Sequence, residues 1–286
     1  MKLKYSIYLI VLIVFQAIGQ QNKFDSIENI LKSKIHDTVK CNVLASFIES
    51  GLDENVWPIY NEKLLHLSLN AAKNTNKADY KRFYFSYYTI ALSNKGFLAS
   101  NKGDFKTSDS LYKQTIFIQK KFNLTEAIGI SYTNLGANSK AQSNVKKSLM
   151  YYDSALKIFL KYNNKNQTAI IYNNLAYIFK NEKEYKTAIK HYKNSMKIHQ
   201  EMKDYSGLAI VMGNLANVNL ENINEKEITS NKNKKIILES LILLERGEKI
   251  TDSLHDENDH AIFLNKLGNF YDYYGDIRIS DKKQKV

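Results

Sequence analysis

The stretch "YNNLAYIFKNEKEYKTAIKHY", from Tyr172 to Tyr192, sets two small residues and a tyrosine at fixed distances from one another. Ala176 follows Asn-Leu, Ala188 comes twelve positions later, and Tyr192 follows after four more. The pattern recurs at steps of forty residues, at Gly96, Ser108 and Tyr112, at Gly136, Ser148 and Tyr152, and, for the first small residue, at Ala216. The chain is therefore built on an internal repeat, and this repeat determines its fold.

The composition agrees with a helical chain that has a sizeable core. The 286 residues are 44% hydrophobic and include one proline and eleven glycines. So few residues of these two types favour long helices and argue against a β-sandwich or barrel. The one cysteine, Cys41, lies in an apolar helical pattern, so we expect it to be a buried hydrophobe and not a reactive thiol.

Each repeat has the pattern of two amphipathic helices when its first small residue is numbered 8. In a helix, positions 4, 7, 8 and 11 share one face. Position 4 holds Leu92, Tyr132, Tyr172, Met212 and Leu264; position 7 holds Lys95, Leu135, Leu175, Leu215 and Leu267; and position 8 holds Gly96, Gly136, Ala176, Ala216 and Gly268. The second helix holds Ser108, Ser148 and Ala188 at position 20, and Tyr112, Tyr152 and Tyr192 at position 24. Small residues at 8 and 20 let two helices approach closely, and the ring at 24 fills the space beside them.

These positions resemble the signature of the tetratricopeptide repeat, which has small residues at 8, 20 and 27 and large ones at 4, 7, 11, 17 and 24. The resemblance covers the chain from about residue 37 and implies an all-α fold, a right-handed superhelical solenoid of antiparallel helix pairs. The family's proline at position 32 is absent, and the period is forty residues where about 34 is usual. Longer second helices, as in the extended-helix branch of the family, would account for both departures.

The repeat also predicts the domain organisation. We expect a signal peptide at 1–19, a helical lead-in at 20–36 and the solenoid at 37–286, with a degenerate first unit at 37–79, units near 89–124, 129–164, 169–204 and 209–257, and an incomplete last unit at 261–286. A polar insertion at 225–236, interpreted as a longer inter-helix loop, explains why Ala216 and Gly268 are 52 residues apart. In the last unit only nine residues follow Ile277, where a second helix would begin, so Leu264, Leu267, Phe270, Tyr271 and Tyr274 would lack a full covering helix.

The first nineteen residues have the pattern of a secretory signal. Lys2 and Lys4 precede an uncharged apolar run, and Ala17-Ile18-Gly19 supplies small residues for cleavage before Gln20. The apolar run is shorter than the roughly 20 residues that span a bilayer. We therefore predict an exported, periplasmic protein, with an uncleaved membrane anchor as the alternative.

Asparagines recur on the helix face that packing leaves free, which in a stacked solenoid lines the concave groove. The predicted peptide-binding groove consists of Asn94, Asn134, Asn173, Asn174, Asn214, Asn217, Lys266 and Asn269. Amide side chains offer donors and an acceptor to the backbone of an extended peptide without demanding particular side chains. The alternative is that asparagine at position 6 is common in the repeat consensus and simply solvated.

Other function classes find little support in the sequence. The net charge of +12 and the many tyrosines suit nucleic acid, but the lysines are spread over every helix and the tyrosines occupy packing positions, so no nucleic-acid partner is expected. There is no glycine-rich phosphate loop, G-x-S-x-G or H-E-x-x-H motif, so we expect no enzyme activity and no cofactor. The cluster "HDENDH", His255 to His260, fits a solvated loop better than a metal site.

Two functions remain open from the sequence. One is an exported scaffold that binds a peptide or protein partner of unknown identity in the groove. The other is the sensory input segment of a truncated signalling protein, because the resemblance extends to the N-terminal halves of repeat-bearing histidine kinases and helix-turn-helix regulators. The uncapped C-terminal end also suggests self-association, since an uncovered apolar terminus favours it.

Overall fold

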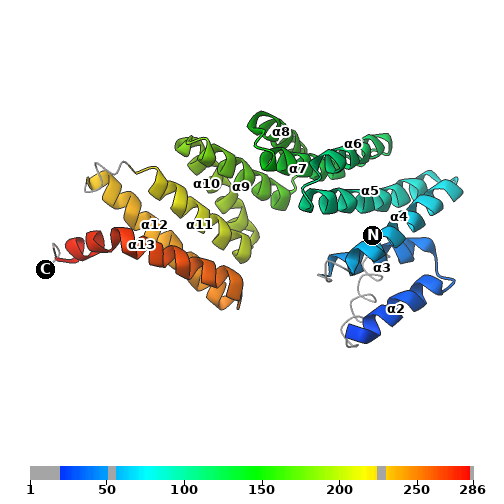
Figure 1. The fold of residues 1–286 in the computed structure, drawn as a ribbon, viewed down its shortest axis with the longest axis horizontal. Coiled ribbons are helices and arrows are strands. Elements are labelled where there is room, and N and C mark those ends of the chain that lie inside the picture. The colour runs from blue at the N-terminus through cyan, green and yellow to red at the C-terminus, as the bar shows by residue number, and fades with distance from the viewer. Residues whose placement is uncertain (1–19, 51–55, 224–229, 284–286) are drawn as a thin grey trace. The chain divides into compact units, whose positions relative to one another are not determined.

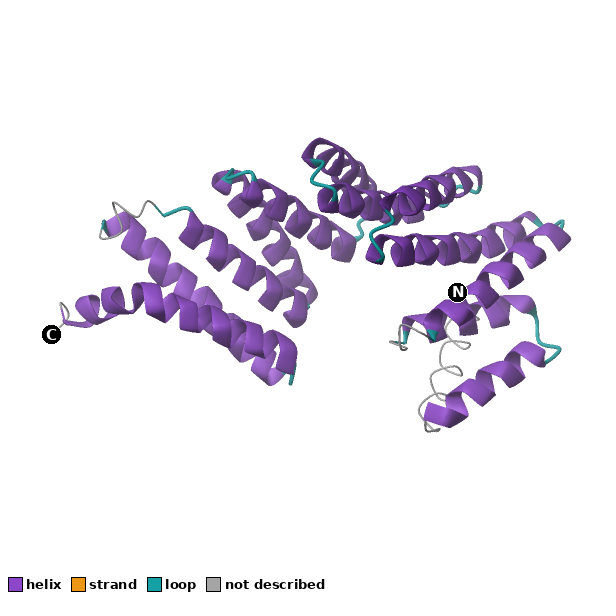
Figure 2. Ribbon diagram, in the orientation of Figure 1, coloured by secondary structure: helices purple, strands orange, loops and turns teal. Residues whose placement is uncertain are grey.

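The computed structural model describes residues 20–50, 56–223 and 230–283, so the predicted signal segment lies outside the described residues. Within these ranges all the regular structure is helical: there are twelve helices and no strand (Figure 2). The all-α prediction is therefore confirmed. None of the helices in these ranges is both long and apolar enough to cross a membrane.

The contacts divide the chain into an N-terminal half, residues 1–138, and a C-terminal half, residues 139–286 (Figure 1). The N-terminal half contains α2 (Gln20–Lys32), α3 (Asp37–Glu49), α4 (Trp57–Asn74), α5 (Ala78–Asn101) and α6 (Phe105–Lys121). Helix α7 (Thr125–Ala141) lies across the division. The C-terminal half contains α8 (Val145–Lys161), α9 (Lys165–Asn181), α10 (Tyr185–Met202), α11 (Tyr205–Glu221), α12 (Asn231–Ser253) and α13 (Glu257–Lys283).

The turns between helices repeat every twenty residues. Each contains a residue with left-handed backbone, at Gly103, Asn123, Ser143, Asn163, Lys183 and Lys203. At the turn after α9, the N–H of Lys183 donates to Lys180 O at 2.9 Å and the N–H of Glu184 to Phe179 O at 2.8 Å, which closes the end of the helix. Turns at Lys102 to Asp104 and Glu182 to Glu184 occur where the sequence suggests them.

Asparagine and aspartate then start most of the following helices. Asn144, Asn164, Asp104 and Asp204 each accept a hydrogen bond from the backbone N–H three residues later. Helices α8 and α9 both have 17 residues, and a turn of three residues follows each, which gives the period of forty. The attribution of this period to longer second helices is therefore wrong for the regular repeats, where first and second helices have nearly the same length: 17 residues in both α7 and α8, and 17 and 18 in α9 and α10.

Close contact at the small residues builds the core of each helix pair. In the N-terminal half, a Cβ placed on Gly96 of α5 would lie 2.8 Å from Cε1 of Tyr112 on α6. In the C-terminal half, Ala176, Ala188 and Tyr192 form one buried cluster between α9 and α10. The rings therefore occupy the space that the missing side chains leave, as the sequence predicts. Cys41 is buried and free, which also agrees with the prediction.

The extra residues of the fourth repeat lie partly in a helix and partly outside the described residues. Helix α11 ends at Glu221 and α12 begins at Asn231, with residues 224–229 outside the described part of the chain. Residues 231–236 of the predicted insertion form the start of α12, which has 23 residues where its counterparts α8 and α10 have 17 and 18. The interpretation of the whole insertion as a loop therefore needs this correction.

Helix α13 differs from the expected last repeat. It runs without interruption from Glu257 to Lys283, so the backbone makes no turn before Ile277. Leu267, Phe270 and Tyr274 pack into the cluster that α11 and α12 form, whereas Leu264 is 52% exposed and Tyr271 is 41% exposed. Of the five side chains expected to lack a cover, only Leu264 and Tyr271 are exposed.

Candidate functional site

The eight predicted groove residues lie on the first helices of the repeats. Asn94 is on α5 and Asn134 on α7 in the N-terminal half, and the other six are on α9, α11 and α13 in the C-terminal half. Asn269 is exposed and the other seven are half-buried. Because the two halves are separate units, each part of the face is described by itself.

In the C-terminal half, asparagines of successive repeats bind one another. Nδ2 of Asn214, at position 6, donates to Oδ1 of Asn173, at position 5 of the preceding repeat, at 3.1 Å. This bond uses one donor of Asn214 and the acceptor of Asn173, and an amide group has further hydrogen-bonding capacity. Asn174 makes no hydrogen bond with the described residues, and the same holds for Asn134 in the N-terminal half. The asparagines thus combine an internal bond with free polar groups, so they are neither a ladder of wholly free amides nor simply solvated side chains.

A lysine and a glycine replace this asparagine pair one repeat later. Lys266 occupies position 6, and Gly213 occupies position 5 of the preceding repeat. A Cβ on Gly213 would lie only 2.6 Å from Nζ of Lys266, so the glycine provides the space for the ammonium group. The same Nζ lies 5.4 Å from the centre of the Phe263 ring, a distance at which a cation is attracted to the ring.

The ammonium group of Lys266 has no ion pair or hydrogen bond with the described residues. Burial lowers the pKa of Lys266; the negative charge of Asp259 opposes this shift and the positive charge of Lys180 adds to it. A half-buried charge without an ion pair or a hydrogen bond is unfavourable unless something supplies the opposite charge. This side chain is therefore the most distinctive feature of the groove face.

A pocket adjoins Lys266 on the same side of α13. It has a volume of about 430 Å³, and its lining combines three of the predicted groove residues with apolar groups: Asn217, Lys266 and Asn269, with Leu220, Glu221, Ile223, Phe270, Tyr273 and Tyr274. The Tyr273 side chain is 82% exposed at this pocket. Polar groups that orient a ligand, beside apolar groups that it can cover, are the usual composition of a binding site.

Sequence reasoning missed a cluster of charged and aromatic side chains on this face. Lys140 and Lys180 place their ammonium groups 4.8 and 5.9 Å from the centre of the Tyr177 ring. Nζ of Lys180 also pairs with Oε1 of Glu221 at 3.0 Å. Tyr177 follows Ala176 directly at position 9, and lysine occupies position 12 in both repeats, so the spacing of positions 9 and 12 is the signal that could have identified the cluster.

In the N-terminal half, Asn94 is held by a buried amide. Nδ2 of Asn94 donates to Oδ1 of Asn61 at 2.9 Å, and Nδ2 of Asn61 donates to the backbone carbonyl of Ala91 at 3.0 Å. Asn61 is 1% exposed, so this chain of hydrogen bonds fixes the orientation of Asn94. This partner comes from α4, whereas Asn214 bonds to the first helix of the preceding repeat, so the asparagines do not form one regular ladder.

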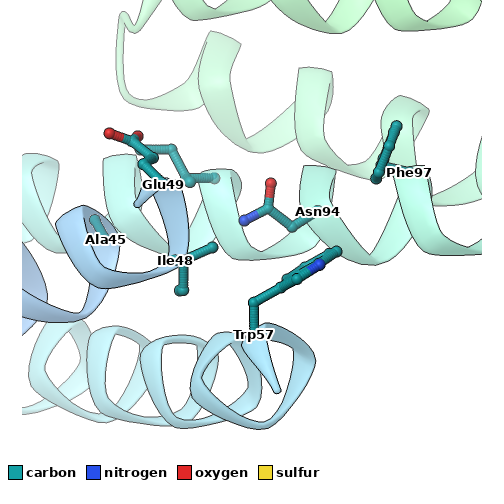
Figure 3. A pocket seen from close by; sticks show the side chains of 7 residues that line it. Ala45, Ile48, Glu49, Trp57, Asn94 and Phe97 are labelled. Carbon is teal, nitrogen blue, oxygen red and sulfur yellow. The ribbon is translucent and has the colours of Figure 1, made fainter. Parts of the chain in front are cut away.

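A second pocket, of about 230 Å³, contains Asn94. Figure 3 shows the amide between Ile48 and Phe97, next to the indole ring of Trp57; Ala45, Glu49 and Ile90 complete the lining. Trp57 and Phe97 were not among the predicted site residues. Their positions depend on how α4 packs against α5, which the repeat pattern does not specify in the degenerate first unit.

The cluster from His255 to His260 spans the turn after α12 and the start of α13, where it has a structural role. His255 has left-handed backbone, and Asp256 accepts a hydrogen bond from the N–H of Asp259 at 3.0 Å, which caps α13. Among the described residues no group of three or more His, Cys, Asp or Glu side chains is arranged to hold a metal ion. Only His255 and Asp256 belong to the inter-helix turn, and Glu257 to His260 form the first turn of α13, so the expectation of a loop over the whole cluster is corrected.

Comparison with known proteins identifies similar folds among solved structures but no relative by sequence. No family model and no curated protein matches the sequence. Among solved structures, BtubC (BKLC) from P. vanneervenii is 19% identical with a TM-score of 0.59, over 78% of this chain and 87% of that one. A putative kinesin light chain with TPR-like repeats from P. anserina is 14% identical with a TM-score of 0.53, over 68% of this chain and 91% of that one.

A third structure belongs to a longer protein. The signal transduction ATPase with numerous domains from Pyrococcus horikoshii, which has a tetratricopeptide repeat sensor, is 14% identical with a TM-score of 0.58. The match covers 97% of this chain and 43% of that protein. Together with the helix pairs, the forty-residue period and the small residues beneath tyrosines, these likenesses show that the chain has the all-α solenoid fold of tetratricopeptide-repeat proteins.

Proposed function

We propose that this chain is a protein-interaction scaffold that binds a peptide, or an extended segment of a partner protein, along the groove face of its C-terminal half. The observation that carries the proposal is the ammonium group of Lys266, which is half-buried beside a pocket and has no ion pair or hydrogen bond with the described residues. A ligand that supplies a negative charge at this point would remove the cost of holding it there.

The surrounding side chains define the chemistry of such a ligand. Asn217 and Asn269 line the same pocket as Lys266 and offer amide donors and acceptors to a peptide backbone. Phe270 and Tyr273 provide apolar surface in that pocket for one side chain of the ligand. The best fit is therefore an extended peptide that carries a carboxylate next to an apolar side chain.

Selection from a library of random heptapeptides on the full chain, followed by calorimetric titration, tests this proposal. Selected peptides should contain an acidic residue, and the Lys266→Met variant should bind them about 10- to 100-fold more weakly, since a hydrogen bond to a charged group contributes about 1.5–3 kcal/mol. The Lys235→Met variant is the matched control, because Lys235 lies on α12 and its side chain is 78% exposed. Equal affinity for the parent chain and the Lys266→Met variant would contradict the proposal.

A second variant tests whether the groove asparagines contribute to binding independently of Lys266. Asn174→Ala removes an amide that makes no hydrogen bond within the described residues, so it should weaken peptide binding while changing stability by no more than about 0.5 kcal/mol. The matching change in the N-terminal half, Asn134→Ala, shows whether a selected peptide also contacts that half. If neither change affects affinity, the asparagines are only solvated surface.

We further propose that the scaffold is exported. The support is the sequence of residues 1–19 alone, where a basic start, an apolar run and small residues at the cleavage point follow one another. Fractionation and N-terminal sequencing should find the chain outside the cytoplasm and beginning at or near Gln20. A cytoplasmic chain that retains Met1 would refute export without affecting the groove.

A further inference from the structure

Helix α13 leaves open a face that the other repeats bury. In repeats that have both helices, a tyrosine of the second helix lies over the small residue at position 8 of the first, as Tyr112 does over Gly96. Tyr192 packs with Ala176 in the same way in the C-terminal half. Both tyrosine side chains are at most 2% exposed. In each half, therefore, a tyrosine of a second helix covers the position-8 face of a first helix.

The corresponding positions of α13 are uncovered. A Cβ placed on Gly268 would have no side chain or neighbouring helix of the described residues within 4 Å, and Leu264 is 52% exposed where Leu92 and Met212 at the same repeat position are 5% and 0% exposed. Ala261 and Tyr271 are exposed on the same side, and the hydroxyl of Tyr271 donates a hydrogen bond to Oε1 of Glu245 on α12 at 3.4 Å. These four residues, Ala261, Leu264, Gly268 and Tyr271, are called the outer face of α13.

The outer face is separate from the two other sides of the helix. Successive residues of a helix are about 100° apart, which places Phe263 and Phe270 on the side that packs into the core. Lys266 and Asn269 lie on the groove side. The outer face occupies the remaining third of the circumference, so a partner bound there would leave the groove accessible.

We propose that the outer face of α13 binds the same face of a second copy of this chain, with the two helices crossing antiparallel at Gly268. The face contains both parts of a position-8 contact, a glycine that admits a close helix and large side chains that can cover a glycine. A twofold axis near Gly268 would place Leu264 of each copy opposite Tyr271 of the other. Such an interface is self-complementary, as twofold symmetry requires.

Charge opposes contact between two copies less on this face than on the lysine-rich surfaces. The chain has a formal net charge of +12, so two copies repel one another over most of their surfaces. The exposed side of α10, for example, presents Lys186, Lys190, Lys193 and Lys197. The four residues of the outer face are uncharged, so contact between two copies there brings no lysines together. The inference goes beyond peptide binding and does not depend on it.

Sedimentation velocity of the full chain at increasing concentration, up to about 100 µM, should show a monomer–dimer equilibrium, as expected for a small interface. The Leu264→Arg variant should dissociate at least tenfold more readily, because it puts a charge from each copy into the contact. Leu160→Arg is the matched control, since Leu160 of α8 is 54% exposed and lies away from α13. A parent chain that remains monomeric would overturn the proposal, as would a Leu264→Arg variant that dimerises like the parent.

Disulfide trapping tests the crossing point independently. Two cysteines can bond only when their Cα atoms lie about 4.4–6.8 Å apart, so Gly268→Cys should give a covalent dimer under mild oxidation. Asn269→Cys, one residue away on the groove side, should not. The native thiol does not interfere, because Cys41 is buried and burial raises its pKa to about 12. Trapping of the Asn269→Cys variant in place of Gly268→Cys would overturn the proposed geometry.

Discussion

The same substitution at two equivalent repeat positions should have opposite effects on stability. Gly96 and Gly268 both stand at position 8 inside a helix, and replacing glycine by alanine there favours the helix by about 1 kcal/mol. At Gly96 the new methyl group would lie 2.8 Å from Cε1 of Tyr112, whose side chain is 2% exposed. At Gly268 it would meet no neighbouring atom within 4 Å in the part of the chain that the structure describes. Only the first change therefore carries a cost of overpacking.

The expected magnitudes follow from these two terms. Overpacking a well-filled core costs about 1–3 kcal/mol, so Gly96→Ala should leave the free energy of unfolding unchanged or lower it by up to about 2 kcal/mol. Gly268→Ala should raise it by up to about 1 kcal/mol. The helix term is common to both variants, so their difference of about 1–3 kcal/mol measures the packing of Tyr112 alone.

Urea unfolding monitored by far-UV circular dichroism at about 1 µM chain provides the measurement, with amide hydrogen exchange as a local readout. The low concentration limits association through the outer face of α13. Exchange should accelerate in α5 and α6 for Gly96→Ala and slow in α13 for Gly268→Ala. A difference between the variants below about 0.5 kcal/mol, or the reverse order of stability, would refute the assignment of position 8 to close helix contact.

Two further predictions concern the turns and the buried tyrosines. Ser143, Lys183 and Gly103 have left-handed backbone, which glycine adopts most easily. Ser143→Gly and Lys183→Gly should therefore each stabilise the chain by about 0.5–1 kcal/mol, and Gly103→Ala should destabilise it by about the same amount. Thermal unfolding that shows no gain for either glycine variant would contradict this expectation. Burial raises the pKa of Tyr112 and Tyr152 to about 12, from about 10 in an unfolded chain. The stability that their neutral side chains contribute is therefore fully present below about pH 10 and is lost as the pH rises from about 10 to about 12. The Tyr152 hydroxyl is buried and has no hydrogen-bond partner in the described ranges, so Tyr152→Phe should be near-neutral at pH 7 and should flatten the alkaline loss of stability by about one proton. An unchanged slope of unfolding free energy against pH would count against this prediction.

The repeat pattern predicted the helices well because the information is local. Residues at positions 4, 7 and 8 fall on one side of a helix whatever the rest of the chain does, and the small residues at 8 and 20 specify which two helices can approach closely. Tyr112, Tyr152 and Tyr192 are accordingly all buried. The same reasoning could not show that the polar residues at 231–236 extend α12, because a polar, lysine-rich stretch fits an exposed helix as well as a loop.

The sequence by itself determined the helix pairs, their forty-residue period and the residues that meet inside each pair, since all of these follow from the periodicity of single helices. Tertiary structure alone decided what the groove face presents. Asn214 and Asn173 are 41 positions apart in the chain, and Lys266 and Gly213 are 53 apart. Whether these residues meet depends on how far one helix is shifted along the other when they pack. That offset is the sum of packing contacts along the whole helix interface, so no short pattern encodes it. The exposure of the outer face of α13 was likewise decided by the tertiary structure, because exposure depends on what lies next to a helix and not on the helix itself.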